Sequence, residues 1–210
     1  MSEIMSKILL LGDRSEVLYH NMDEMKPLIN VLEEHYEVVV SEDYPEITKN
    51  SLVGIDLILN YIDNWQNRGN EKVEGVLCDY LLEGGRILTV HSGILITSAS
   101  KLLALHGASF NGHEDYDLLT FKRLGDSHYI TKDMNSFSIY DEPYEFEFMS
   151  DRKVDIIMEF EFKGKTYPAG WTVEEGAGKL AYLAFGHDSK TFAQKPVQEI
   201  IKRSIDWLLQ

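Results

Sequence analysis

Short apolar runs alternate with amphipathic stretches in the first half of the sequence, and this alternation limits the possible folds more than any other feature. The run at residues 7–11 (KILLL) is apolar throughout, which is typical of a strand buried on both faces. The pattern predicts further strands at residues 36–40, 56–61 and 86–90, and helices at residues 24–34 and 71–83. Strands and helices that alternate over short connections favour an α/β fold with a parallel sheet covered by helices.

The second half of the sequence has a different pattern. We expect strands at residues 118–122, 156–163 and 180–185, a short helix at residues 99–105 and a final helix at residues 195–209. Residues 156–163 (IIMEFEFK) alternate apolar and polar side chains, as in an antiparallel or edge strand with one solvated face. Residues 106–155 look loop-rich and hold many of the histidines and acidic residues, so we expect this segment to line a ligand-binding crevice.

The size and charge of the chain exclude several kinds of partner. The 210 residues suit one domain spanning residues 1–210, and no linker-like segment divides them. The chain carries 20 basic and 35 acidic residues, a formal net charge of -15. Such a chain lacks the basic surplus that nucleic acids and anionic membranes require, so we expect neither partner. A neutral small molecule such as a sugar meets no such repulsion.

The cysteine count and the apolar runs bear on localisation. Cys78 is the single cysteine, so the chain can form no intramolecular disulfide and suits a reducing compartment. The N-terminal apolar run is too short for a signal sequence or a membrane span, and no longer run follows. We therefore expect a cytoplasmic protein.

His91 and Ser92 directly follow the strand predicted at residues 86–90. Polar residues at the carboxyl end of a buried strand have the geometry of a nucleophile elbow, although the G-x-S-x-G motif is absent. Ser92 could be a nucleophile, or His91 could be an acid/base group or a metal ligand. The structural alternative is that His91 bonds a neighbouring loop and Ser92 caps the next helix.

His187 follows the strand predicted at residues 180–185 in the same way. Two histidines that each follow a buried strand of an alternating fold are expected to meet at one rim of the sheet, so we predict a site containing His91 and His187. Three further candidates lie in the loop-rich segment. His113 follows Gly112, and Asp141 and Glu142 form a carboxylate pair before a proline.

The aromatic residues of YPAGW, residues 167–171, have two alternative interpretations. They could form a stacking wall for a ring-shaped ligand, with Trp171 as its main surface. Core packing is the more common role of such residues.

Six blocks of the sequence, in order, resemble those of the trehalose-utilisation (ThuA-like) family: LLLGDRSEVLYHN, GGRILTVHSG, LHGASFNGH, DEPYEF, PAGW and AYLAFGHD. The resemblance extends from residue 7 to the terminal helix. It implies a flavodoxin-like three-layer sandwich with a mostly parallel sheet, of the class I glutamine-amidotransferase-like type. The resemblance implies that the site residues of the family correspond here to His91, His113, Asp141, Glu142, Trp171 and His187. The family pattern also has a histidine near the end of the first strand, where this chain offers His20.

The resemblance also implies what the site has lost. The wider superfamily has a catalytic cysteine at the elbow after the fourth strand, paired with a late histidine. Here His91 stands at the elbow, His187 matches the late histidine, and Cys78 lies on the preceding helix. We therefore expect no glutaminase activity.

Three functional hypotheses follow. The first is an enzyme acting on a sugar or sugar derivative in carbohydrate catabolism, with His91, His187 and Glu142 as catalytic groups. His113, Asp141, Trp171 and Ser92 would bind the substrate. In a variant, two or three histidines and Glu142 hold a divalent metal such as zinc. The second is a non-catalytic sugar-binding or regulatory module. The third is a structural subunit that forms a homo-oligomer through exposed Trp207 and Leu208.

Overall fold

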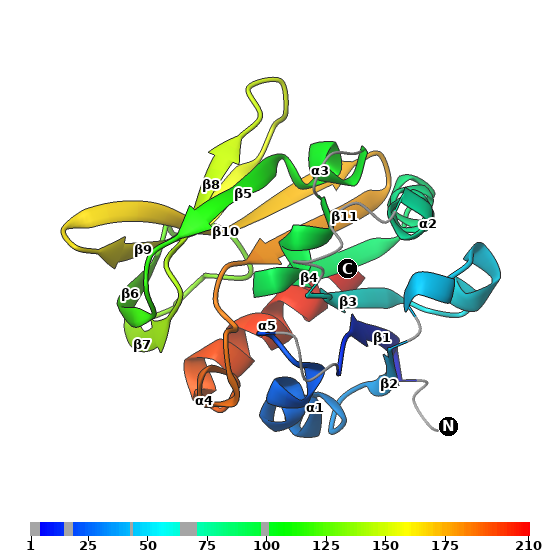
Figure 1. Cartoon of the computed structure of the whole chain (residues 1–210), viewed down its shortest axis with the longest axis horizontal. Helices are drawn as coiled ribbons and strands as arrows, with labels where there is room; N and C mark the ends of the chain where they lie inside the picture. Colours follow the sequence, from blue (N-terminus) through cyan, green and yellow to red (C-terminus); the bar gives the residue numbers. More distant parts are fainter. Residues whose placement is uncertain (1–4, 15–18, 43, 64–70, 98–100) are drawn as a thin grey trace.

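The computed structural model describes residues 5–14, 19–42, 44–63, 71–97 and 101–210. Its largest feature is a nine-stranded sheet in the order β2-β1-β3-β4-β11-β10-β9-β6-β7 (Figure 1). These strands are β1 (Lys7–Gly12), β2 (Glu37–Ser41), β3 (Leu57–Tyr61), β4 (Arg86–Val90), β6 (Asp117–Arg123), β7 (Phe137–Asp141), β9 (Asp155–Phe162), β10 (Lys165–Glu175) and β11 (Gly178–Leu183). A separate two-stranded sheet pairs β5 (Ala108–His113) with β8 (Tyr144–Phe148).

The half of the large sheet from β2 to β11 is parallel. Strands β2 and β1, β1 and β3, β3 and β4, and β4 and β11 all pair in parallel. Every residue of β3 is buried, because helices cover both faces of this half. The α/β prediction is confirmed, and the strands predicted at residues 7–11, 36–40, 56–61, 86–90 and 180–185 all form.

The half from β11 to β7 is antiparallel, so the sheet as a whole is mixed. The alternating run at residues 156–163 becomes β9, as predicted. The expectation of a loop-rich segment at residues 106–155 is wrong for much of its length, since β5, β7 and β8 lie within it. These strands are short; the alternating sequence YEFEF of β8 is nevertheless a strand pattern, so for β8 the prediction overlooked a signal that the sequence contains.

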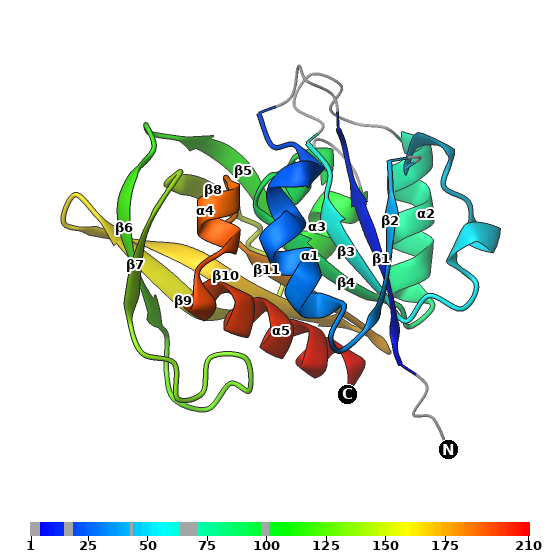
Figure 2. The same cartoon turned by 90° about the horizontal axis from the view of Figure 1, so that it is seen from below.

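Helices cover the two faces of the parallel half. On one face lie α1 (Lys26–Leu32), α4 (Ser189–Phe192) and α5 (Lys195–Leu209); on the other lie α2 (Glu71–Leu82) and α3 (Lys101–His106) (Figures 1 and 2). Pro27 and Pro196 stand in the first turns of α1 and α5, as predicted. The helix predicted at residues 99–105 is α3, and residues 99–100 fall outside the described residues.

The final helix packs its apolar face inward. Trp207 is 9% exposed and Leu208 is fully buried, so the expected exposure of these two residues is wrong. The amphipathic pattern of α5 serves the monomer core, because Val197, Ile201 and Ile205 are buried on the same side. Trp207 and Leu208 therefore cannot form the contact surface of a homo-oligomer, and the homo-oligomer itself stays a prediction.

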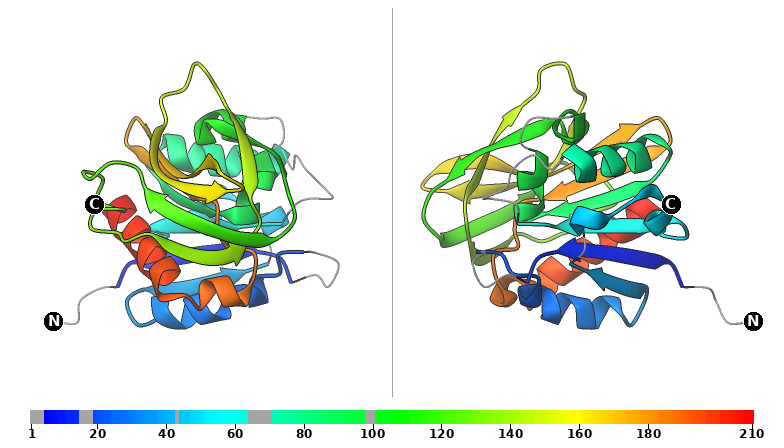
Figure 3. Two further views of the ribbon diagram at one scale, coloured as in Figure 1. Left: turned by 90° about the vertical axis from the view of Figure 1, so that its left-hand side faces the viewer. Right: turned by 45° about the vertical axis from the view of Figure 1, so that its right-hand side comes forward.

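The sheet of β5 and β8 lies over the face of the large sheet that also carries α3 (Figure 3). Phe146 and Phe148 of β8 pack their rings against Trp171 of β10, at centroid distances of 5.0 and 5.1 Å. This contact fixes the small sheet above the carboxyl ends of the parallel strands. Among the described residues, no helix has the length and apolar character needed to span a membrane.

Candidate metal centre

Four side chains from distant parts of the sequence meet at one edge of the sheet. His20 follows β1, His91 follows β4, His187 follows β11, and Glu142 comes directly after β7. Because β1, β4 and β11 belong to the parallel half, their carboxyl ends open onto the same rim. The predicted convergence of His91 and His187 is therefore present, and His20 joins them.

The backbone at the rim is shaped for close approach of these side chains. His91 has a φ of 46°, a left-handed conformation that is costly for a residue other than glycine. Gly186 has a φ of 137°, and a Cβ on it would lie 3.1 Å from the His91 Cβ. Glycine at this position therefore allows the segment carrying His187 to pass close to the elbow formed by His91.

The four donor atoms form a tight cluster. His20 Nε2 lies 3.2 Å from His91 Nε2 and 3.2 Å from His187 Nδ1. Glu142 Oε2 lies 3.3 Å from each of these three nitrogens. All four atoms lie within 4.8 Å of one another.

Five of the six donor–donor distances match those of a tetrahedral metal site. Donors placed about 2.0–2.1 Å from a common centre at tetrahedral angles lie about 3.3–3.4 Å apart, as in zinc sites with nitrogen and oxygen ligands. Three imidazoles and one carboxylate also match the donor preferences of zinc and its neighbours among the transition metals. The residues present thus fit a divalent ion.

Polar contacts behind the cluster orient two of the rings. His91 Nδ1 donates to the Ala184 carbonyl at 2.5 Å, so its Nε2 presents a lone pair to the cluster when the ring is neutral. His20 Nδ1 lies 3.4 Å from Asp63 Oδ2, which also accepts the His20 backbone N–H at 3.1 Å. Such outer contacts fix the orientation of metal-binding histidines.

Electrostatics favour positive charge at the centre of the cluster. Burial would raise the pKa of Glu142, but hydrogen bonds from His187, His20 and His91 hold it well below its ordinary range. Burial opposes protonation of His20, yet hydrogen bonds to Asp63 and Glu142 raise its pKa to about 9. The pKa of His187 is raised against the effect of burial by its hydrogen bond to Glu142, while burial lowers the pKa of His91. A bound metal cation would place positive charge beside the Glu142 carboxylate, as protons on the histidines do.

A cavity of about 300 Å³ adjoins the cluster. This volume is at the small end of the range for ligand pockets. It is lined by Tyr19, His20, Asp63, Leu95, Phe110, His113, Glu142 and Tyr144. His113 is a predicted site residue that does line the cavity; its Nδ1 donates to the Glu114 carbonyl, which leaves Nε2 as the basic nitrogen of a neutral ring.

Other predicted site residues lie behind the cavity. Asp141 is fully buried, accepts the Gly186 N–H at 2.9 Å and lies 3.7 Å from His91 Nδ1, so it supports the site without facing a ligand. Burial raises the pKa of Asp141. Ser92 is also fully buried, and its Oγ has no hydrogen-bond partner among the described residues.

Trp171 does not provide the expected stacking surface. The residue is fully buried in β10, where its indole N–H donates to the His106 carbonyl and its ring packs on Tyr182. The structural alternative of core packing is the correct one for Trp171. The stacking partner within the site is Tyr144, whose ring lies 4.1 Å from that of His91.

Sequence reasoning gave Asp63 and Tyr144 no role in the site. Asp63 comes two residues after β3, at the same rim as His91, and this position was the available signal. Tyr144 reaches the cluster because β8 crosses above the rim, a placement that no local pattern reveals.

Solved structures with this fold cover nearly the whole chain. A ThuA-like protein from Bacteroides uniformis is 13% identical, with a TM-score of 0.76, over 99% of this chain and 93% of that chain. A cytoplasmic protein from Salmonella typhimurium LT2 is 14% identical, with a TM-score of 0.75, over 96% and 99%. A glutamine amidotransferase from Thermotoga maritima is 11% identical, with a TM-score of 0.64, over 98% and 99%. At these identities the likeness shows a shared fold.

Comparison of the sequence with curated proteins finds no match. Comparison with family models matches ThuA, described as trehalose utilisation, over residues 8–208. The match includes His20, His91, His187 and Glu142, the four residues whose donor atoms cluster at the rim of the sheet. The resemblance predicted from the six sequence blocks is confirmed, and the chain belongs to the ThuA trehalose-utilisation family.

Proposed function

We propose that this protein binds a divalent transition-metal ion, with zinc as the best fit, through His20, His91, His187 and Glu142. The observation that carries the proposal is that five of the six distances among the four donor atoms are 3.2–3.3 Å, the spacing of ligands around a tetrahedral ion. Full burial of His91 favours a ligand over an acid/base group, because a side chain without exposed surface cannot touch a substrate.

We further propose that the metal-bearing cavity acts on a small sugar or sugar derivative. The family description supports a carbohydrate, and the net charge of -15 favours a neutral ligand over an anion. His20 and Glu142 line the cavity, so an oxygen of the ligand can approach the metal from that side. The ion would polarise a hydroxyl or carbonyl oxygen there, and His113 would exchange protons with it.

The proposal includes the absence of glutaminase activity. His91 occupies the elbow after β4, and Cys78 is buried in α2. It also places the protein in the cytoplasm, which suits its single cysteine.

A second candidate is a metal-stabilised sugar-binding module without chemistry. It is favoured by the number of protein ligands, because four protein donors close a tetrahedral shell in structural zinc sites. Catalysis would require a fifth ligand from the cavity. The two candidates therefore share the metal and differ in turnover.

The metal is tested by calorimetric titration of Zn²⁺ into chelator-treated protein. We expect one equivalent to bind, and His187→Ala to weaken binding at least about 100-fold, because it removes a direct ligand. The matched control is His35→Ala, which removes an exposed histidine away from the cluster and should bind zinc as the unmodified protein does. Equal zinc affinity of His187→Ala and the unmodified protein would rule out the proposed ligand set.

Turnover is then tested on the zinc-loaded protein with a panel of sugars. The enzyme proposal predicts that His113→Gln keeps zinc and loses turnover. Sugar binding by the zinc-loaded protein, with no turnover of any sugar, would favour the binding module.

A further inference from the structure

A second cavity lies beside the metal centre and is not used by the proposed function. It has a volume of about 330 Å³ and is lined by Tyr116, Leu118, Ser138, Ile139, Tyr140, Lys190, Thr191 and Gln194. Three of these apolar side chains are unusually exposed: Tyr140 is 57%, Leu118 47% and Tyr116 39% exposed. Leu118 of β6 and Tyr140 of β7 are directly paired across the two strands. They make an apolar patch of the kind that marks binding sites.

A line of rings joins this cavity to the metal centre. The His187 ring contacts that of Tyr116 at a centroid distance of 5.0 Å, and Tyr116 in turn stacks on Tyr140 at 6.1 Å and 23°. The Tyr116 hydroxyl donates to Asp188 Oδ2 at 3.1 Å, which anchors this ring beside His187. The rings of Tyr116 and Tyr140 therefore extend from His187 to the second cavity.

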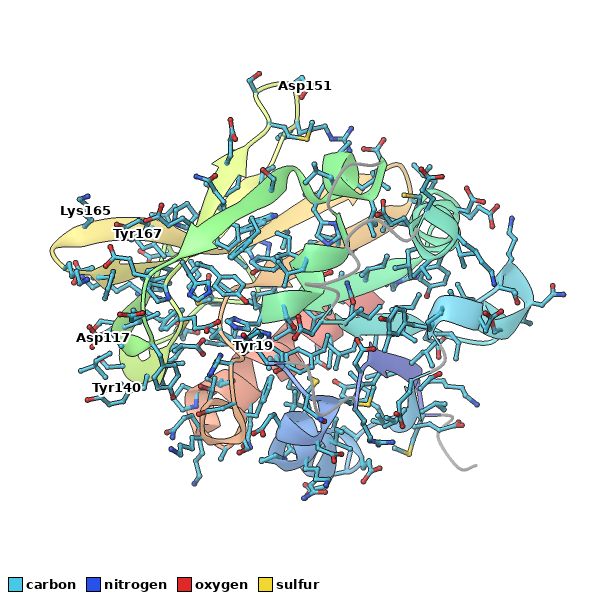
Figure 4. The ribbon with its side chains drawn as sticks, viewed as in Figure 1. Tyr19, Asp117, Tyr140, Asp151, Lys165 and Tyr167 are labelled. Atoms are coloured by element: carbon cyan, nitrogen blue, oxygen red, sulfur yellow. The ribbon has the colours of Figure 1, made fainter. Side chains whose placement is uncertain are left out.

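Residues 140–142 contribute side chains to both cavities. Tyr140, Asp141 and Glu142 are consecutive: the first lines the second cavity, the next is buried, and the third is a proposed metal ligand. Figure 4 shows Tyr140 projecting outward from β7, near Asp117 of β6. The Thr191 hydroxyl contacts both the Tyr140 carbonyl and Asp141 Oδ2 at 3.2 Å, which ties α4 to this segment. The two cavities are thus held in a fixed relation.

We propose that the second cavity is a subsite for the second ring of a neutral two-ring glycoside whose first ring lies at the metal. The exposed parts of the Tyr116 and Tyr140 rings offer a surface for the C–H face of a pyranose ring. Ser138, Lys190 and Gln194 at the same cavity supply hydrogen-bonding groups for ring hydroxyls. This inference rests on the proposed function, because it takes the first ring to bind beside the metal.

The test compares one-ring and two-ring sugars on zinc-loaded protein by calorimetry. The probes are glucose, trehalose, maltose and cellobiose. We expect at least one disaccharide to bind about tenfold more tightly than glucose. Tyr140→Ala should remove this difference and change glucose affinity less than about twofold, since a tenfold difference is about 1.4 kcal/mol, which is within the range for contact with one aromatic ring. Tyr140→Phe keeps the ring and should keep the difference.

The control variant is Tyr129→Ala, which removes an exposed tyrosine outside both cavities. It should bind every sugar as the unmodified protein does. A disaccharide advantage that persists in Tyr140→Ala, or disaccharides that bind no better than glucose, would overturn the subsite and leave the metal pocket standing. Failure of the unmodified protein to take up zinc would overturn the proposed function. Zinc uptake without binding of any sugar would overturn the subsite together with the sugar assignment.

Discussion

Gly93 shows how closely the chain is packed behind the elbow. A Cβ on this residue would lie 2.3 Å from the Asn60 carbonyl oxygen, which is a clash with backbone that cannot move freely. The Asn60 side chain in turn donates to the Gly93 carbonyl at 2.9 Å. The loop after β4 is thereby fixed to the end of β3, and His91 is held in its left-handed conformation.

We predict that Gly93→Ala lowers the free energy of unfolding by about 1–3 kcal/mol, because the added methyl group must displace the end of β3. Urea denaturation followed by circular dichroism measures the change. The matched control is Gly75→Ala in α2, where nothing lies within 4 Å of the added Cβ. Since alanine is the better helix former, that variant should gain about 0.5–1 kcal/mol. The same sign for both variants would contradict this account of the elbow.

The ends of strands, rather than their middles, carry the site. Asp141, the last residue of β7, accepts the backbone N–H of Glu142 at 2.8 Å and that of Gly186 at 2.9 Å. It therefore joins the end of β7 to the segment between β11 and α4. Through these bonds one buried carboxylate positions both Glu142 and the segment that carries His187.

Asp141→Asn is expected to weaken this junction. An amide NH₂ must face one of the two backbone N–H groups, so one acceptor is lost, at a cost of about 1–3 kcal/mol of unfolding free energy. Zinc affinity should fall about tenfold or more, because the ligands are less well oriented. Thermal denaturation and zinc titration measure the two effects. Asp117→Asn, at the exposed position paired with Asp141 on β6, should change neither. Unchanged zinc affinity in Asp141→Asn would contradict the positioning role.

The strands of the parallel half were predictable, and in the antiparallel half β6 and β9 were predicted at residues 118–122 and 156–163 while β7 and β10 were not. A strand such as β3 is buried on both faces, so its apolar run is continuous and visible in the sequence. Strands β5 and β8 owe their burial to Trp171 and the rim below them, which are distant in sequence. Strand β5 has a weak pattern, with Gly112 at a bulge, whereas the alternating YEFEF of β8 is a strand pattern that the prediction overlooked.

The same reasoning applies to the residues of the site. His91 and His187 were predictable because each follows a recognisable strand, and Glu142 was proposed from the carboxylate pair before Pro143 and again from the family blocks. His20 lies several residues beyond β1, and only the fold brings it to within 3.2 Å of His91. Trp171 was misplaced because its aromatic motif lies inside β10 rather than in a turn.

At the scale of the whole molecule, the site lies at the carboxyl ends of the parallel strands, with the small sheet above it (Figure 3). The parallel half supplies the histidines, and the antiparallel half supplies Glu142 through β7. Each half of the sheet alone would hold an incomplete cluster. The mixed sheet is therefore the feature that makes a His₃Glu site possible on this fold.

The central claim is that these four residues bind one metal ion, and anomalous diffraction from crystals grown with zinc tests it most directly. We predict a single strong peak at the zinc edge, about 2.0–2.2 Å from His20 Nε2, His91 Nε2, His187 Nδ1 and Glu142 Oε2. A map with no peak among these atoms, in crystals whose zinc is bound at other residues, would contradict the claim.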